Sequence, residues 1–424
     1  MSDELNPSAS PRRAALVFIF ITVVLDMLAL GMVVPVLPKL VEDFMSGNTA
    51  RAAEWVGIFA TVWAAMQFVF SPVLGGLSDR FGRRPIILLS NFGLGADYIV
   101  MALAPTIGWL FLGRVISGIT AASFSAASAY IADVTPPEKR AAGYGMLSAG
   151  FGLGFILGPA LGGVLGNIDP RLPFWVAAGL SLLNAMYGMF VLPESLPQDR
   201  RVAFSWQRAN PIGSIKLLRS HAELLGLSTV TFLTNIAHEA LPTTFVLYAM
   251  YRYGWNQRTI GLAIATVGVC SALVGAGMVQ PLVARFGDRR VMLGGMWFNL
   301  AGFLIYGLAP TGLLFWTGVP IGGLGGLSGP PMQSLMTRRV KETEQGQLQG
   351  ALSSLRGVAF MIGPIIFTTT FASFIGPNRD RHLPGAPYLL AAAIVMLSTV
   401  IASRATSARA EGIVASTQPL EATD

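Results

Sequence analysis

Three carboxylic acids lie within long apolar stretches of this chain. They are Asp26, Asp97 and Glu239. A charged group in lipid is costly, so such a residue is paired, neutralised or used for function. A buried carboxyl group favours its protonated form, and it can take up a proton on one side of a membrane and release it on the other. We therefore predict proton coupling at these residues. The alternative for each is a structural polar pair, and for Asp97 the candidate partner is Arg114.

Two further ionisable residues accompany Glu239. His238 either tunes Glu239, contacts a ligand, or is an interior histidine satisfied by hydrogen bonds. Arg356 could neutralise Glu239 within the second half of the chain. The three histidines and the single cysteine are scattered, so the sequence predicts no metal site and no cofactor. No nucleophilic residue and base form a pattern typical of catalysis in this sequence. We therefore predict that the chain is not an enzyme.

The composition requires that lipid surrounds most of the elements that position these residues. Hydrophobic residues make up 53% of the chain and charged residues only 12%, about half the charged share of a soluble domain. The apolar runs are too long for barrel strands, so they predict membrane-spanning helices. The net charge of +7 could indicate nucleic acid binding, but the basic residues are dispersed among short loops, which favours a topological role.

The apolar runs predict an all-α integral membrane protein of twelve transmembrane helices in two six-helix, pseudo-symmetric halves. The expected spans are 14–38, 54–78, 86–104, 108–132, 143–166, 172–192, 223–248, 258–284, 290–309, 312–335, 346–375 and 386–403. An even number of spans puts both termini on one side. Twenty Lys and Arg residues lie in segments on that side against seven on the other, which predicts that both termini are cytoplasmic.

The polar stretches between the spans define the expected domain boundaries. Residues 1–13 and 404–424 form cytoplasmic tails, 14–192 the N-terminal half, 193–222 a cytoplasmic linker, and 223–403 the C-terminal half. Within the linker, Ser205 to Arg208 and Ile212 to Leu218 mix apolar with basic residues. We expect part of this linker to form a helix on the inner leaflet.

The chain repeats itself at an offset of 205 residues. Phe81-Gly82 recurs as Phe286-Gly287, and Gly158-Pro159 recurs as Gly363-Pro364. A constant offset near half the chain length indicates two parallel repeats of one unit, as in transporters built from two related halves. The repeats differ in their charges at four pairs of positions: Asp26 and Thr231, Asp97 and Gly302, Arg114 and Val319, and Asp133 and Arg338. We therefore expect proton handling to concentrate in the first half.

Small residues dominate the fifth span. Gly154, Gly158, Gly162 and Gly163 accompany Pro159, and small residues let membrane helices approach closely. The pattern indicates either a tight helix crossing or a proline-kinked glycine face on which two halves rock.

Two motifs carry a resemblance to a known family. The segment from Asp79 to Pro85 resembles the loop 2–3 signature of the major facilitator superfamily, and the glycines around Pro159 resemble the fifth-helix motif of its drug/proton antiporters. Further matches to the tetracycline-resistance efflux branch extend over nearly the whole chain: Leu25-Asp26, Gly31, Pro35 to Pro38, Gln67, Asp97-Tyr98, Gly113-Arg114, Ser117 to Thr120, Gly254 to Asn256 and Gln345-Gly346 with Gln349-Gly350.

The resemblance implies roles for residues at matching positions. Asp79 and Arg83 would form a cytoplasmic gate, with Asp79 near the start of a helix of the second half and Arg83 reaching Asp133. The remaining gate residues implied by the motif are Gly75, Arg80, Gly82 and Arg84. By the same resemblance, Gln67 and Arg114 would line or support the central cavity and its proton path, together with Asp26 and Asp97. We also expect His238, Asn299 and Arg356 to line this cavity.

The second half departs from the family pattern. Asn299 stands in the region where the tetracycline exporters carry an acid in the ninth span, and Cys270-Ser271 stands where they carry a histidine in the eighth. The expected function is proton-coupled export of small amphipathic compounds, tetracycline-like or multidrug, by a monomer in a bacterial inner membrane. The alternatives are a proton-coupled nutrient importer and a membrane receptor or assembly factor without transport activity.

Overall fold

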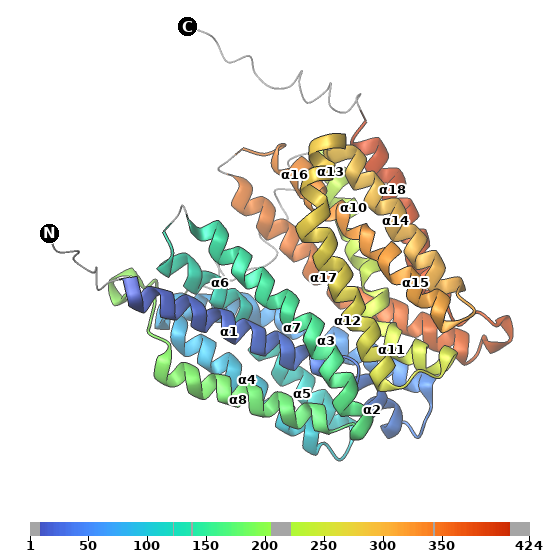
Figure 1. Cartoon of the computed structure of the whole chain (residues 1–424), viewed down its shortest axis with the longest axis horizontal. Coiled ribbons are helices and arrows are strands. Elements are labelled where there is room, and N and C mark those ends of the chain that lie inside the picture. The colour runs from blue at the N-terminus through green and yellow to red at the C-terminus, as the bar shows by residue number, and fades with distance from the viewer. Residues whose placement is uncertain (1–8, 122, 137–138, 205–221, 342–343, 408–424) are drawn as a thin grey trace, which may run out of the picture. The chain divides into compact units, whose positions relative to one another are not determined.

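The computed structural model describes residues 9–121, 123–136, 139–204, 222–341 and 344–407 of the 424-residue chain. Within these ranges the regular elements are helices, and no strand is assigned (Figure 1). The expected amphipathic helix of the linker lies outside the described residues.

By the density of its contacts the chain divides into two compact units. Unit 1 comprises Met1–Asn210 and Ala249–Gly268, and unit 2 comprises Pro211–Tyr248 and Val269–Asp424. The described part of the first unit up to Val191 contains eight consecutive α-helices. They are α1 (Ala9–Val33), α2 (Leu37–Phe44), α3 (Thr49–Phe81), α4 (Arg83–Leu103), α5 (Ile107–Thr120), α6 (Ser123–Val134), α7 (Arg140–Ile168) and α8 (Leu172–Val191).

The helices that follow are more often interrupted. They are α10 (Ala222–His238), α11 (Ala240–Tyr253), α12 (Gln257–Leu273), a π-helical turn (Val274–Met278), α13 (Val279–Phe286), α14 (Asp288–Leu308), α15 (Gly312–Gly323), a 3₁₀ segment (Leu324–Ser328), α16 (Gly329–Thr337), α17 (Gln345–Ile375) and α18 (Ala386–Ala405). The end of α11 and most of α12 belong to unit 1.

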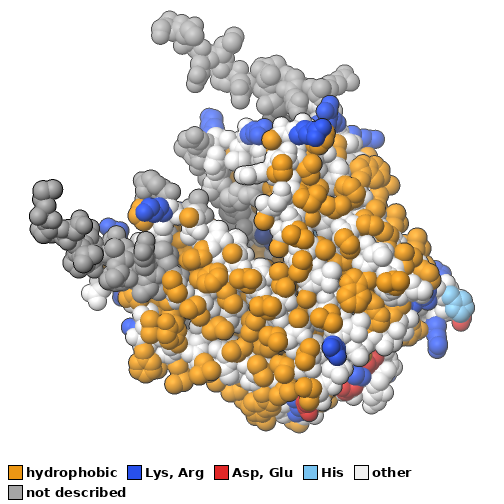
Figure 2. Space-filling model, in the orientation of Figure 1, with side chains coloured by type: hydrophobic (Ala, Val, Ile, Leu, Met, Phe, Trp, Pro, Cys, Tyr) orange, Lys and Arg blue, Asp and Glu red, His pale blue; other side chains and the backbone are white. Residues whose placement is uncertain are grey.

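Nine helical segments of the described chain are long and apolar enough to cross a membrane. The fourth, seventh and tenth predicted spans are each broken, as α5 with α6, α10 with α11, and α15 with α16. Hydrophobic side chains cover the visible helix faces, whereas Lys and Arg gather near helix ends (Figure 2). This distribution is that of a multi-pass membrane protein, whose apolar surface is solvated by lipid.

The helix boundaries preserve the 205-residue offset. Helix α1 ends at Val33 and α10 at His238, and α4 begins at Arg83 while α14 begins at Asp288. The break after Thr120 corresponds to a position within the 3₁₀ segment of unit 2. The internal repeat is therefore a repeat of structure, including the places where helices are interrupted.

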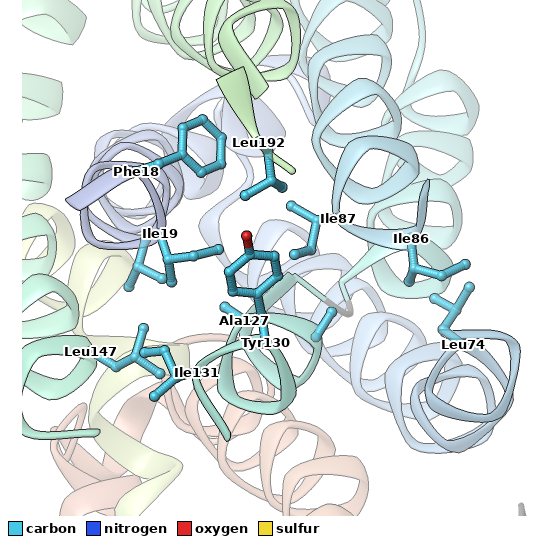
Figure 3. Packing of buried hydrophobic residues seen from close by; sticks show 12 residues of the cluster. Phe18, Ile19, Leu74, Ile86, Ile87, Ala127, Tyr130, Ile131, Leu147 and Leu192 are labelled. Carbon is cyan, nitrogen blue, oxygen red and sulfur yellow. The ribbon is translucent and has the colours of Figure 1, made fainter. Parts of the chain in front are cut away.

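Apolar clusters hold the helices of each unit together. In unit 1, residues of α1, α3, α4, α6 and α7 surround Tyr130, which is fully buried (Figure 3). In unit 2, Tyr248 contacts the rings of Phe315, Phe371 and Tyr388, and its hydroxyl donates to the carbonyl oxygen of Tyr306 at 3.1 Å. The contacts with Phe371 and Tyr388 are edge-to-face, a geometry that adds to the stabilisation from burial.

Candidate functional site

Arg83 links three helix ends of unit 1. Its Nη1 atom lies 2.5 Å from Asp79 Oδ1 at the end of α3, and its Nε atom lies 3.1 Å from Asp133 Oδ2 at the end of α6. Nη1 also lies 3.3 Å from the hydroxyl of Ser78. The Arg83 and Asp133 side chains are 12% and 20% exposed, so this ion pair is better shielded than a surface pair.

The sharp turn at Gly82 produces this geometry. Gly82 ends α3 and precedes α4 with φ of 108°, a conformation that glycine adopts without steric cost. The turn places Arg83 at the first position of α4, facing the ends of α3 and α6. A cavity of about 190 Å³ adjoins it, lined by residues of α3, α4 and α6 that include Ser71, Ser78 and Arg83.

The neighbouring basic residues have different contacts. The Arg80 guanidinium lies over the exposed Phe81 ring, 5.0 Å from its centroid. Arg84 donates from Nη2 to the carbonyl oxygen of Met189 near the end of α8, at 2.5 Å, where a cation is favoured by the helix dipole. Gly75 has open space where a β-carbon would lie. Only Arg83 of these basic residues joins the acids of the predicted gate.

Unit 2 contains a corresponding ion pair at the equivalent helix ends. Arg338 Nη2 lies 2.8 Å from Asp288 Oδ2, and the Ser334 hydroxyl lies 3.5 Å from the same oxygen. Arg289 donates to the Thr406 hydroxyl and to the Ser403 carbonyl at the end of α18. Arg289 thus repeats the helix-capping contact of Arg84.

Asp97 and Arg114 form a buried ion pair between α4 and α5. Arg114 Nη2 lies 3.1 Å from Asp97 Oδ2, and the two side chains are 8% and 0% exposed. Gly113 leaves no room for a β-carbon, which would lie 2.6 Å from Asp97 Oδ1. Arg114 also contacts the Met101 sulfur. The structure therefore contains the pair that the sequence offered as one of two explanations for Asp97.

Asp26 belongs to a polar group between α1 and α8. Asn184 Nδ2 donates to Asp26 Oδ1 at 3.3 Å, and the Thr22 hydroxyl donates to Asn184 Oδ1 at 3.2 Å. All three residues are buried. Sequence reasoning did not find Asn184, because it lies 158 positions from Asp26, although a buried amide in an apolar span is itself a signal.

Gln67 contacts the backbone at a helix break. Its Nε2 atom lies 3.4 Å from the carbonyl oxygen of Ala121, the residue that follows α5. A carbonyl at a helix end lacks an intrahelical partner, so Gln67 supports the interrupted fourth span.

The glycines of α7 bring its backbone against α1. A β-carbon on Gly158 would lie 2.8 Å from Gly31 Cα, and one on Gly154 would lie 2.8 Å from the Leu28 nitrogen. Gly162 lies against the Met32 backbone in the same way. Gly163, on another face, meets Gly261 of α12. Close backbone contact of this kind is the use of small residues in membrane helices.

In unit 2 the helix break falls on Glu239. Helix α10 ends at His238 and α11 begins at Ala240. The Glu239 side chain lies against α17, where a β-carbon on Gly363 would lie 2.7 Å from Glu239 Cγ. Interrupted helices at membrane depth are features of transporter binding sites.

The other two residues predicted for the unit 2 cavity are separate from Glu239. No ion pair joins Arg356 to Glu239 among the described residues, since Arg356 precedes Gly363 on α17 by seven residues, about 10 Å along a helix. Asn299 is buried on α14 and lies against Gly325 of the 3₁₀ segment. The part of the chain that the structure describes contains no group of three or more residues suited to a metal ion.

Comparison with known proteins identifies the family. The model of the Major Facilitator Superfamily matches residues 19–364 and 227–419. The class C tetracycline resistance protein of Escherichia coli is 38% identical over 362 residues, 85% of this chain and 90% of the relative. The class G protein of Vibrio anguillarum is 34% identical, covering 86% of this chain and 92% of the relative.

A solved structure shares the fold. The human organic anion transporter MFSD10 (TETRAN) matches with a TM-score of 0.67 at 22% identity, covering 92% of this chain and 99% of that one. The chain therefore belongs to the Major Facilitator Superfamily, and within it to the family that includes the tetracycline resistance proteins.

Proposed function

We propose that this chain is a proton-coupled exporter of small amphipathic compounds, with tetracyclines as the first candidates. The observation that carries the proposal is the burial of two carboxyl groups, Asp26 and Asp97, inside the spans of unit 1. Intramembrane acids of this kind are typical of proton relays in transporters. The similarity to tetracycline resistance proteins supports the direction of transport and the class of substrate.

In this proposal substrate moves outward as protons move inward. About 100 mV of membrane potential provides about 2.3 kcal/mol per proton, enough for a substrate gradient of roughly 40-fold. Asp26 and Asp97 carry or support the proton path, and Glu239, at a helix break, is the candidate acid of the second half. Gln67, Arg114, His238, Asn299 and Arg356 are the candidate cavity residues.

Alternating access requires a gate and a hinge. The Asp79, Arg83 and Asp133 cluster is the proposed gate, on the cytoplasmic side of a bacterial inner membrane with both termini cytoplasmic. The glycine face of α7 is the proposed rocking surface. Residues 14–192 and 223–403 form the two halves, joined by the linker 193–222. The chain acts as a monomer and as a transporter, with no enzymatic step.

Transport in vesicles tests this proposal. Inside-out vesicles with an imposed proton gradient, acidic inside, are given tetracycline, cationic dyes or small peptides. The proposal expects uptake of tetracycline or a dye into the vesicle lumen, abolished by a protonophore. Release of only preloaded peptides from the lumen, together with protons and down the proton gradient, would identify an importer.

A further inference from the structure

Glu194 follows α8 directly and reaches back to the first turn of α4. Its Oε1 atom accepts from the backbone amides of Arg83 at 2.8 Å, Ser195 at 3.0 Å and Leu196 at 3.0 Å. Its Oε2 atom accepts from the amide of Arg84 at 3.3 Å. One carboxylate therefore satisfies two free amides of α4 from 111 and 110 residues away.

Helix α4 requires a carboxylate from elsewhere. It begins with Arg83 and Arg84, it has no acid in its first turn, and its capping residue Gly82 has no side chain. The first amides of a helix have no intrahelical partner, and the helix dipole disfavours cations at this end. Helix α14, which begins at the equivalent position, supplies its own acid as Asp288. Glu194 thus brings to the start of α4 the negative charge that Asp288 gives to the start of α14.

The segment after Glu194 contacts the gate as well. The Ser195 hydroxyl donates to Asp133 Oδ2 at 3.0 Å, the oxygen that also receives the Arg83 Nε. The Val202 amide donates to the carbonyl oxygen of Asp79 at 3.1 Å. All three charged members of the proposed gate therefore contact residues 194–202, through side chain or backbone.

The Glu194 carboxylate occupies the space beside the turn. A β-carbon on Gly82 would lie 2.6 Å from Glu194 Cδ. The Tyr130 hydroxyl donates to the carbonyl oxygen of Pro193 at 3.1 Å, which holds the residue before Glu194 against α6. Glycine at position 82 leaves room for this carboxylate, and the hydrogen bond from Tyr130 helps to hold it in place.

We propose that Glu194 is a positioning residue of the gate: it fixes the first turn of α4 so that Arg83 holds Asp79 and Asp133 together. This assignment rests on the proposed function, in which that cluster opens and closes. Without the carboxylate the first turn of α4 frays, and Arg83, whose backbone belongs to that turn, loses its simultaneous reach to both acids.

The test combines two measurements on the full-length protein. Hydrogen–deuterium exchange of the peptide covering residues 83–90 reports the cap without any transport assay. Tetracycline uptake into inside-out vesicles gives kcat and KM for Glu194→Gln, Asp133→Asn and the double variant. The matched control is Asp169→Asn, because the Asp169 carboxylate also accepts a backbone amide, that of Arg171 at 2.6 Å, elsewhere in unit 1.

Glu194→Gln is expected to accelerate exchange at the start of α4 and to lower kcat about tenfold with KM unchanged, as for the loss of hydrogen bonds to a charged group. In the Asp133→Asn background the same change is expected to lower kcat less than twofold, because the ion pair that Glu194 positions is already absent. Glu194→Asp retains the charge and is expected to recover most of the rate. Asp169→Asn is expected to lower kcat equally, if at all, in both backgrounds.

Equal losses from Glu194→Gln in both backgrounds, or unchanged exchange at the start of α4, would overturn the positioning role. Full activity of Asp133→Asn would instead overturn the gate itself, and with it this role of Glu194. If Glu194→Gln does not accumulate in the membrane, Glu194→Ala, which also removes the carboxylate, takes its place in the same cycle, and the same outcomes decide.

Discussion

Arg83 and Asp288 occupy equivalent positions 205 residues apart, each as the first residue of its helix, and they carry opposite charges. Their partners are exchanged as well, since Asp133 corresponds to Arg338. Each unit nevertheless contains the ion pair, at 3.1 Å between Arg83 Nε and Asp133 Oδ2 and at 2.8 Å between Arg338 Nη2 and Asp288 Oδ2. In both repeats an ion pair therefore joins these two helix ends, but the acid and the base have exchanged positions.

Reversing the pair of unit 2 tests whether pairing or polarity matters. Asp288→Arg places a second cation beside Arg338. Because this cation also lies at a helix N-terminus, where the dipole disfavours it, we expect the variant to lose most transport activity. Adding Arg338→Asp restores an ion pair with the polarity of unit 1, and at least half of the activity should return. Vesicle uptake of the transported compound measures both variants. A double variant as inactive as Asp288→Arg would show that polarity is required.

The glycine face of α7 gives a matched pair of substitutions. Gly158→Ala places a methyl group 2.8 Å from Gly31 Cα and from the Leu28 carbonyl oxygen, whereas Gly152→Ala meets nothing within 4 Å. We expect Gly158→Ala to cost about 1–3 kcal/mol through overpacking. Thermal unfolding in detergent measures the change, and Gly152→Ala should unfold at or above the wild-type temperature. Similar melting temperatures for both variants would show that the close contact of Gly158 with Gly31 does not limit the side chain at position 158.

Variants of the buried Asp97 and Arg114 pair distinguish a structural role of this pair from a role in proton coupling. Arg114→Met leaves an unpaired buried carboxylate, and we expect a loss of about 3–5 kcal/mol in stability. The double variant with Asp97→Leu replaces the pair by apolar groups and should regain most of that stability. Because Asp97 is a candidate for proton coupling, the double variant should still fail to release protons on substrate addition. Recovery of proton release would assign the pair a structural role alone.

Gly363 provides a test of Glu239 that leaves the acid in place. A methyl group at position 363 would lie 2.6 Å from Glu239 Cβ, whereas one at position 346 of the same helix meets nothing within 4 Å. We expect Gly363→Ala to lower the transport rate several-fold by displacing Glu239, and Gly346→Ala to leave it unchanged. Glu239→Gln should be at least as impaired as Gly363→Ala. Wild-type rates for Glu239→Gln would exclude this acid from the proton path.

The general architecture can be predicted from the sequence. The length of each apolar run and the charge of each loop depend on residues that are neighbours in the chain, and the repeat shows as matches at a fixed spacing of 205 residues. The breaks at Glu239 and after Thr120 carry no such signal, since a helix can be interrupted without a change in hydropathy. Asn184 beside Asp26 and Glu194 beside Arg83 are contacts between positions far apart in the chain. Such contacts depend on how the helices pack, which composition and spacing do not specify.

The contact of Arg356 with Glu239 was predicted from opposite charge alone, and this ion pair is absent from the described residues. Glu239 lies at the break between α10 and α11, and the residue of α17 that lies against it is Gly363, seven positions after Arg356. The Asp97 and Arg114 pair could be anticipated because neighbouring spans joined by a short loop pack together, as α4 and α5 do here.

Substrate-triggered proton release in inside-out vesicles tests the central claim of proton-coupled export most directly. The vesicles are acidified inside, the lumenal pH is followed with a fluorescent probe, and tetracycline and cationic dyes are added to the wild type and to Asp26→Asn. The account predicts that at least one compound raises the lumenal pH of wild-type vesicles and that Asp26→Asn abolishes this response. An unchanged response in Asp26→Asn would contradict proton coupling at Asp26, and an absence of response to every compound would contradict proton-coupled export of this class.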